Sequence, residues 1–182
     1  MRISVVGTGY LGATHAACLA ELGHEVMGLD ADPEKIKTLA SGELPFFEPG
    51  LVELVRRHLS TGRLRFTTSY EEIGSWAEVH FLGVGTPQRS AEGTADTSFV
   101  ESAVRSLAKA ITRDSLIVGK STVPVGTVRG LLEILSRHQD PQVEIGLAWN
   151  PEFLREGLAV QDTLHPDRIV VGVEDPRHAD AL

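Results

Sequence analysis

The sequence predicts an α/β protein with a doubly wound, mostly parallel sheet and helices on both faces. Short apolar runs rich in β-branched residues alternate along the whole chain with stretches of helical periodicity. The first run, Arg2–Val6, leads straight into a glycine-rich turn and then into a helix-compatible stretch over Ala13–Leu22. A buried strand, a tight turn and a helix in this order begin a βαβ unit, whose strands are parallel.

The other strands are expected where apolar runs are bounded by turn residues. These runs cover residues 25–29, 64–67, 79–83, 115–120, 144–149 and 168–173. Between them, helical periodicity predicts helices over residues 51–59, 97–111 and 126–137.

One further helix is marked by its ends. Asp32 is a good N-cap, Pro33 fits the first helical position, and Gly42 fits the residue that stops the helix. The polar segment 88–96 predicts a mobile surface loop, and residues 175–182 predict the first turns of another helix.

The turn after the first strand has the spacing G-x-G-x-x-G, formed by Gly7, Gly9 and Gly12. In a dinucleotide site the first glycine permits a tight turn, the second lets pyrophosphate approach the backbone, and the third lets helix and strand pack closely. Asp30 ends the second apolar run, where a carboxylate accepts hydrogen bonds from the adenosine ribose and repels a 2′-phosphate. These residues predict a Rossmann-type domain that prefers NAD to NADP. The alternative is the same fold binding another nucleotide or none.

Composition and charge exclude several other classes of protein. With 182 residues, 42% of them hydrophobic and 23% charged, the chain suits one well-buried domain. Its formal net charge of −8 argues against nucleic-acid binding, which needs a basic face. No apolar run approaches the roughly 20 residues of a membrane span, and the chain opens on a core strand rather than a secretion signal. A single cysteine, Cys18, fits the reducing cytoplasm.

Three polar clusters follow expected strands. They are Gly83–Pro87, Lys120–Gly126 and Asn150–Gly157. Each alone is compatible with ordinary turn chemistry, because Gly, Pro, Ser and Asn populate turns. The carboxyl ends of parallel strands share one edge of the sheet, where ligands bind, so we expect the clusters to converge beside the dinucleotide.

With these motifs the chain resembles the amino-terminal, NAD-binding domain of the UDP-glucose 6-dehydrogenase family, within the UDP-glucose/GDP-mannose dehydrogenases. The motifs that match run in family order along nearly all of the sequence. They are Gly7–Gly12, Phe47–Leu51, Val84–Pro87, Ser121–Gly126, Asn150–Gly157 and Pro166–Gly172.

The resemblance implies oxidation of UDP-glucose to UDP-glucuronate, a step of nucleotide-sugar and polysaccharide synthesis, in two hydride transfers to two NAD with a cysteine adduct between them. In the family the nucleophilic cysteine, a central helix and a substrate domain follow this domain, and the full-length proteins are homodimers or larger. We therefore expect residues 1–182 to form one NAD-binding domain that is inactive alone. One alternative is a dehydrogenase of GDP-mannose or of a UDP-sugar other than UDP-glucose, although the residues of Ser121–Gly126 favour UDP-glucose over GDP-mannose. Another alternative is a non-catalytic NAD-binding module.

The resemblance also implies residue roles. Glu152 is the implied acid/base carboxylate, and Thr122 orients a water. The implied cofactor residues are Gly7, Thr8, Gly9, Tyr10, Leu11, Gly12, Asp30, Lys35, Val84, Gly85, Thr86, Pro87, Ser121, Thr122, Val123 and Glu156. The implied substrate residues are Glu152, Phe153, Leu154, Arg155 and Glu156. No metal site is expected, since no histidine pair has the spacing of a zinc motif.

Purely structural interpretations stand beside these roles. Glu152 suits the cap of a short helix after Asn150-Pro151, and Thr122 suits a strand-end hydroxyl bonded to a carbonyl. Lys35 is by default a solvated cation, and Arg155 a surface ion-pair partner. Cys18 lies among alanines and leucines of the first helix, so we expect a small buried apolar residue rather than a nucleophile.

Overall fold

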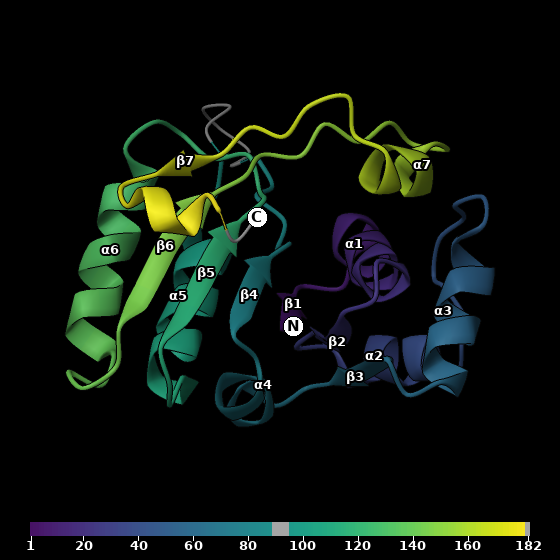
Figure 1. Ribbon diagram of the computed structural model, residues 1–182, viewed down its shortest axis with the longest axis horizontal. Helices are drawn as coiled ribbons and strands as arrows, with labels where there is room; N and C mark the ends of the chain where they lie inside the picture. Colours follow the sequence, from purple (N-terminus) through teal and green to yellow (C-terminus); the bar gives the residue numbers. More distant parts are fainter. Residues whose placement is uncertain (89–94, 181–182) are drawn as a thin grey trace.

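The computed structural model describes residues 1–88 and 95–180. Its centre is one sheet with the strand order β3-β2-β1-β4-β5-β6-β7, parallel except for β7 (Figure 1). The strands are β1 (Arg2–Val6), β2 (Glu25–Leu29), β3 (Leu64–Thr67), β4 (Val79–Leu82), β5 (Ser115–Gly119), β6 (Ile145–Trp149) and β7 (Gly172–Val173). The doubly wound α/β class predicted from the sequence is confirmed.

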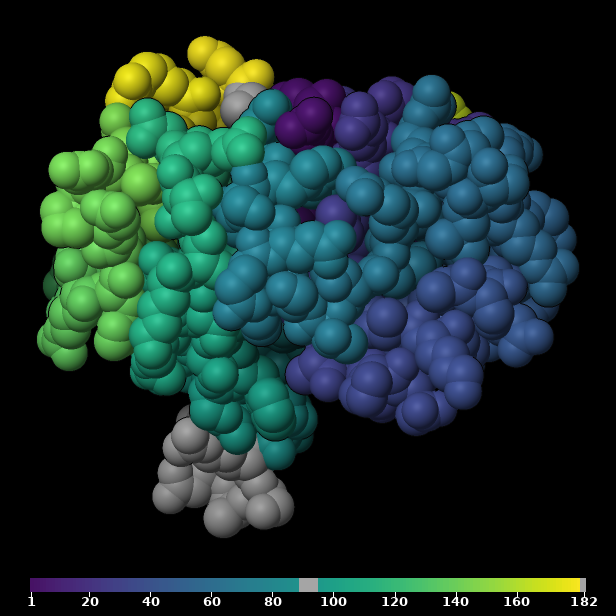
Figure 2. All heavy atoms as spheres, turned by 90° about the horizontal axis from the view of Figure 1, so that it is seen from below, coloured from purple at the N-terminus to yellow at the C-terminus, as the bar shows by residue number. Residues whose placement is uncertain are grey.

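Helices pack on both faces of the sheet. They are α1 (Tyr10–Glu21), α2 (Pro33–Ala40), α3 (Leu51–Ser60), α4 (Tyr70–Trp76), α5 (Ser98–Ala110), α6 (Thr127–His138), α7 (Ala159–Leu164) and the 3₁₀ turn η1 (Pro176–His178). In Figure 1, α6 lies at the β6 end and α3 at the opposite end. Seen from below in Figure 2, the purple amino-terminal segment reaches the surface over a small area, because β1 is a central strand.

Alternate residues of each strand enter two separate apolar cores. Val6 and Leu82 point to the core shared with α5 and α6, whereas Val5 and Phe81 point to the core shared with α1 and α3. The strands are therefore covered on both faces, which explains why they read as continuous apolar runs in the sequence.

The chain changes direction across the sheet at β1. It proceeds from β1 to β2 and β3 on one side, then returns to β4 on the other side of β1. This reversal is a topological switch point, and the crevice outside the carboxyl ends of β1 and β4 is where such sheets bind ligands. The glycine-rich turn follows β1 directly, so the fold places it at this crevice.

The ends of the second helix agree with the sequence. The Asp32 side chain accepts hydrogen bonds from the backbone N–H groups of Glu34 and Lys35, Pro33 is the first helical residue, and Gly42 has a φ of +79° just past the C-cap. A left-handed residue after a helix favours glycine, because only glycine avoids the Cβ penalty. None of the helices in the described part of the chain has the length and apolar character that a membrane crossing requires.

The sequence prediction was wrong at residues 168–173. Only Gly172 and Val173 form a strand, and it is antiparallel to β6. The apolar side chains before them are largely exposed, with Ile169 at 58% and Val170 at 43%. A backbone carbonyl there is instead used by a side chain, because Asn150 Nδ2 donates to the Val170 oxygen at 2.8 Å.

Other differences concern short elements. Helices α4 and α7 were not predicted, since each is a helix of seven residues or fewer in a region rich in polar residues. Near the carboxyl end, the expected helix is a single 3₁₀ turn with Asp175 as its N-cap. Most of the loop expected over 88–96 lies outside the described residues, although Gln88 and Ala95 pair across it in one antiparallel bridge.

Candidate functional site

The three glycines of the turn after β1 occupy three different environments. Gly7 has a φ of +88°, and a Cβ atom on it would lie 2.8 Å from the Val84 nitrogen. A Cβ atom on Gly12 would lie 1.8 Å from the Gly7 carbonyl oxygen, so α1 packs against the turn more closely than any side chain allows. A Cβ atom on Gly9 would meet nothing within 4 Å. Gly9 thus leaves open space over the backbone, as the approach of a pyrophosphate requires.

The start of α1 supplies the donors that such an anion needs. The first four N–H groups of a helix have no acceptor within the helix. Gly9 is the N-cap of α1 and provides no side-chain cap, and the first turn carries no acidic residue. The positive end of the helix dipole and these N–H groups therefore face the open side of Gly9, which fits a diphosphate.

Asp30, at the end of β2, is bonded to the same turn. Its Oδ2 accepts from the Thr8 nitrogen at 2.9 Å, the Thr8 hydroxyl at 3.1 Å and the Lys35 ammonium at 2.9 Å, and its Oδ1 accepts from the Asp32 nitrogen at 3.1 Å. Burial raises the pKa of the Asp30 carboxyl, but the Lys35 ammonium and the N–H donors lower it below its ordinary value overall. Asp30 is therefore an ordered, ionised carboxylate. Lys35 is its ion-pair partner rather than a free solvated cation.

The loops after β4 and β5 lie side by side, as the strand order requires. The Thr86 hydroxyl donates to the Thr122 carbonyl oxygen at 2.9 Å, and the Ser121 hydroxyl donates to the Val84 carbonyl oxygen at 2.5 Å. From β6, the indole N–H of Trp149 donates to the Ser121 carbonyl oxygen at 3.0 Å. The polar clusters expected to converge at one edge of the sheet are therefore joined by hydrogen bonds.

A cleft of about 440 Å³ opens beside this edge, on the α1 side of the sheet. Residues 152–155, four of the five predicted substrate residues, line it together with His15 of α1 and Lys120 at the end of β5. Neither the glycine-rich turn nor Thr122 lines this cleft. The structure thus gathers most of the predicted substrate residues around one cleft, which the glycine-rich turn does not line.

Glu152 lies in an extended segment that crosses from β6 to α7 above the sheet (Figure 1). Its Oε2 accepts a hydrogen bond from the Leu154 nitrogen at 2.6 Å. No helix begins after Asn150-Pro151, so the expected helix cap is wrong, and the carboxylate stabilises a local turn instead. Its other oxygen remains available to a ligand in the cleft.

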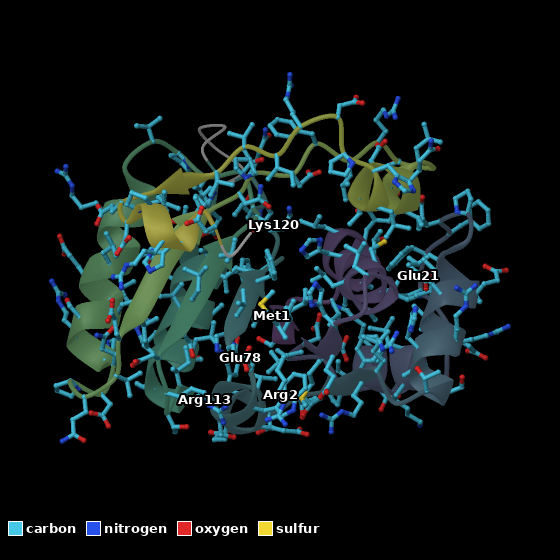
Figure 3. All side chains as sticks on the ribbon, in the orientation of Figure 1. Met1, Arg2, Glu21, Glu78, Arg113 and Lys120 are labelled. Carbon is cyan, nitrogen blue, oxygen red and sulfur yellow. The ribbon has the colours of Figure 1, made fainter. Side chains whose placement is uncertain are left out.

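Lys120 opens one of the polar clusters predicted for this edge of the sheet, but no role of its own was predicted for it. Its side chain lies beneath the crossing segment (Figure 3) and is only 9% exposed. Its Nζ donates a hydrogen bond to Asn150 Oδ1 at 2.9 Å. Burial lowers the pKa of the Lys120 ammonium to about 8, opposed by the nearby Glu152 carboxylate. The sequence feature that could have indicated this burial is the position of the lysine directly after a buried strand, where a solvated surface cation is not expected.

His15 completes the wall of the cleft formed by α1. Its ring packs edge to face on Phe81, with centroids 4.6 Å apart. Burial, helped by the Lys120 charge, lowers the pKa of His15 to about 3, so the ring is neutral at physiological pH. In the described part of the chain its Nε2 is buried without a hydrogen-bond partner.

Several remaining candidates have ordinary structural surroundings. Arg155 forms an ion pair with Asp162 at 2.6 Å, and its backbone nitrogen donates to the same carboxylate. Thr122 and Glu156 are exposed. Cys18 is fully buried, and burial raises the pKa of its thiol to about 12, so the expected buried role is confirmed and a thiolate is disfavoured.

The switch-point topology, the open glycine turn and the carboxylate at the end of β2 define a Rossmann-type dinucleotide-binding domain. Comparison with known proteins identifies the family. All residues, 1–182, match the NAD-binding domain of the UDP-glucose/GDP-mannose dehydrogenase family, and the chain belongs to this family. Its cofactor is accordingly NAD.

Several relatives are dehydrogenases of nucleotide sugars. The chain is 46% identical over 182 residues to the UDP-glucose 6-dehydrogenase YwqF of Bacillus subtilis, covering 100% of this chain and 41% of the relative. A UDP-glucose dehydrogenase structure from Pyrobaculum islandicum is 43% identical with a TM-score of 0.93, covering 99% of this chain and 42% of that one. A GDP-mannose dehydrogenase structure from Pseudomonas aeruginosa is 38% identical with a TM-score of 0.92, over 100% and 43%. The chain thus spans about two fifths of each relative's length.

Proposed function

We propose that this chain is the NAD-holding part of an enzyme that oxidises UDP-glucose to UDP-glucuronate. The observation that carries this proposal is the pairing of an open dinucleotide turn with a separate cleft at the same edge of the sheet. The cleft presents a carboxylate, Glu152, and a buried cation, Lys120, to whatever binds there. A domain that only bound NAD would have no need of this second, charged site.

The turn and the strand ends would hold the cofactor along the sheet edge. The N–H groups of Gly9–Gly12 bind the diphosphate, and Asp30 accepts a ribose hydroxyl at Oδ1, the oxygen with the smaller number of protein donors. The loops that begin at Val84 and Ser121 border the nicotinamide half. When bound, NAD supplies the hydride acceptor for each oxidation step.

The residues around the cleft would handle protons and orient the sugar. Glu152 has one oxygen fixed by the Leu154 nitrogen, which leaves the other to accept the proton of the sugar hydroxyl. The backbone of residues 153–155 borders the nucleotide sugar, and Thr122, which lies in the loop after β5 and does not line the cleft, orients a water. Lys120 places a positive charge near the carboxylate and near the developing negative charge of the substrate oxygen.

Covalent catalysis needs a thiolate that Cys18 does not supply. It is the single cysteine of the sequence, it is buried, and its pKa is raised. We infer that turnover requires a thiol from outside residues 1–182, and that the chain works in a reducing compartment, the cytoplasm, where such a thiol stays free.

Calorimetry and an activity assay test this proposal. The chain is titrated with NAD, and is then assayed with UDP-glucose alone and after addition of the carboxyl-terminal part of a relative. Binding of NAD with turnover only in the mixture is the expected result. Binding without rescue favours a non-catalytic module, a candidate that the buried state of Cys18 supports. Turnover of GDP-mannose without UDP-glucose overturns the proposed substrate.

A further inference from the structure

Glu48 is a buried carboxylate in the loop before α3. It is 2% exposed, and among the described residues none of its hydrogen-bond donors is a cationic side chain. Its Oε2 accepts from the Tyr10 hydroxyl at 2.5 Å and the Gly157 nitrogen at 2.9 Å, and its Oε1 accepts from the Val160 nitrogen at 3.4 Å. Burial raises the pKa of Glu48, but these donors together lower it below its ordinary value, so the carboxylate is ionised.

The donors come from two segments far apart in the sequence. Tyr10 is the first residue of α1, directly after Gly9 in the glycine-rich turn. Gly157 follows Glu156 at the end of the segment that crosses from β6 to α7. The Tyr10 hydroxyl also lies 3.3 Å from the Gly157 nitrogen, so the three groups form one junction. Phe46 packs against the Tyr10 ring, with centroids 5.2 Å apart, and shields it.

A buried carboxylate without a cation carries a large desolvation penalty, which only a full set of hydrogen bonds offsets. Tyr10 remains a proton donor here, because burial and the Glu48 carboxylate raise the pKa of its hydroxyl to about 12. An apolar contact would join these segments without that penalty. The carboxylate makes directional hydrogen bonds, which an apolar contact does not, and so it fixes the Tyr10 hydroxyl and two backbone nitrogens in defined positions.

We propose that Glu48 is a positioning residue that holds the crossing segment, residues 150–158, at a fixed place relative to the glycine-rich turn. This inference rests on the proposed function. Through Gly157 it fixes the position of Glu156, which the family resemblance implies contacts the nicotinamide half of NAD, while the diphosphate grip depends on Gly9 and the start of α1. Loss of Glu48 should therefore weaken contacts to the nicotinamide half and spare contacts to the adenosine half.

The test compares NAD with ADP-ribose, which lacks nicotinamide, by calorimetry on the 182-residue chain. Glu48→Gln keeps the shape of the side chain but presents an NH₂ group to one of the donors. The expected result is a five- to tenfold weaker Kd for NAD and a Kd for ADP-ribose within twofold of the wild type. Glu43→Gln, an exposed carboxylate of the same loop, is the matched control and should change neither.

Hydrogen exchange reports the position of the segment without a ligand. Glu48→Gln should speed exchange of the amides of residues 154–160 and leave those of β4 and β5 unchanged. If Glu48→Gln fails to fold, Tyr10→Phe keeps the ring and removes one donor, and the same criteria apply to it.

Each contrary outcome has a separate meaning. The positioning role is overturned if Glu48→Gln leaves hydrogen exchange at residues 154–160 unchanged, or if it weakens the affinities for NAD and ADP-ribose equally. It is also overturned if the wild-type chain binds both ligands with the same Kd. A wild-type chain that binds neither ligand would instead overturn the proposed function.

Discussion

The Asp30 carboxylate accepts hydrogen bonds from both the backbone N–H and the hydroxyl of Thr8, at 2.9 and 3.1 Å. The end of β2 is thereby tied to the glycine-rich turn by the protein's own groups. A carboxylate already fixed in this way loses little side-chain entropy when a ribose hydroxyl binds to it. The relationship also means that Asp30 supports the turn as well as the cofactor.

Asp30→Ala should therefore weaken NAD binding by about 1–3 kcal/mol, the range for losing a hydrogen bond to a charged group. It should also narrow the preference for NAD over NADP, because the charge that repels a 2′-phosphate is gone. Calorimetry with both cofactors measures the two effects. Asp32→Ala is the control, since it removes an N-cap two residues away, costing about 1 kcal/mol of stability, and should leave the NAD affinity unchanged. An unaltered affinity in Asp30→Ala removes this residue from the site.

Gly9 and Gly12 offer a matched pair of substitutions with opposite effects. Gly12→Ala places a methyl group 1.8 Å from the Gly7 carbonyl oxygen, so the helix must move, and the free energy of unfolding should fall by about 3 kcal/mol or more. In Gly9→Ala the methyl group meets no protein atom. Stability should stay within about 0.5 kcal/mol of the wild type. The methyl group occupies the approach to the backbone, so NAD affinity should drop at least tenfold.

Urea unfolding and NAD titration of the two variants check this pair. The interpretation of the turn fails if Gly9→Ala binds NAD as well as the wild type does. It also fails if Gly12→Ala is as stable as the wild type, because the close approach of α1 to the turn would then be incorrect.

Most of the sheet was predictable because its strands are buried on both faces. Three of the five residues of β1 are apolar, and two of the glycines that follow it, Gly7 and Gly12, are required by contacts that only a missing Cβ allows. The Asp32 cap and the left-handed Gly42 were also predictable, because each residue meets a requirement of the backbone at one end of α2. Local patterns of this kind carry their explanation within a few residues.

Glu48 and Lys120 lie in motifs that the sequence shows, but the part each plays depends on partners far along the chain. Glu48 is recognisable as a site residue only when Tyr10 and Gly157 are brought to it, 38 and 109 residues away. Lys120 shows its burial only when the crossing segment lies above it. The strand predicted over residues 168–171 is absent for a similar long-range reason, because the Asn150 side chain donates a hydrogen bond to the Val170 carbonyl oxygen.

Two of the buried histidines, His15 and His80, predict an acid-sensitive fold. Burial lowers the pKa of His80 to about 4 and that of His15 to about 3, so both stay neutral in the fold while the unfolded chain binds protons below about pH 6.5. Stability is therefore fully present above pH 6.5 and is lost as the pH falls toward 4. With both groups the slope should approach about 2.7 kcal/mol per pH unit near pH 5.

Replacing His80 isolates its share of that slope. His80→Asn is not titratable and retains polar atoms for the Ser4 hydroxyl, which lies 2.7 Å from His80 Nδ1. The free energy of unfolding, measured from pH 7 to 4.5, should then fall less steeply by about 1.4 kcal/mol per pH unit. His165→Gln, at an exposed position, should follow the wild-type curve. Parallel curves for His80→Asn and the wild type would show that this ring titrates normally.

Lys120 predicts a substitution that stabilises the fold. Its ammonium is buried, and the pKa is lowered from 10.5 to about 8, so keeping the charge at pH 7 costs the folded state about 3 kcal/mol. Lys120→Met fills a similar volume without charge and loses one hydrogen bond to Asn150, worth about 1–2 kcal/mol. The free energy of unfolding at pH 7 should therefore rise by about 1–2 kcal/mol in the variant.

The pH dependence separates this explanation from simple repacking. Between pH 8 and 10 the unfolded wild-type chain keeps a proton on this lysine that the folded chain has lost, so Lys120 should add stability as the pH rises, against the loss expected from the buried Cys18 thiol. In Lys120→Met that contribution should be absent, so its stability should fall relative to that of the wild type as the pH rises, whereas Lys37→Met, at an exposed position, should follow the wild type. Urea unfolding at both pH values gives the comparison. A Lys120→Met protein that is less stable at pH 7 would mean that the cation is fully compensated by its surroundings. A more stable one would mean that the fold tolerates a destabilising charge at the floor of the cleft, as expected of a residue kept there for binding or chemistry.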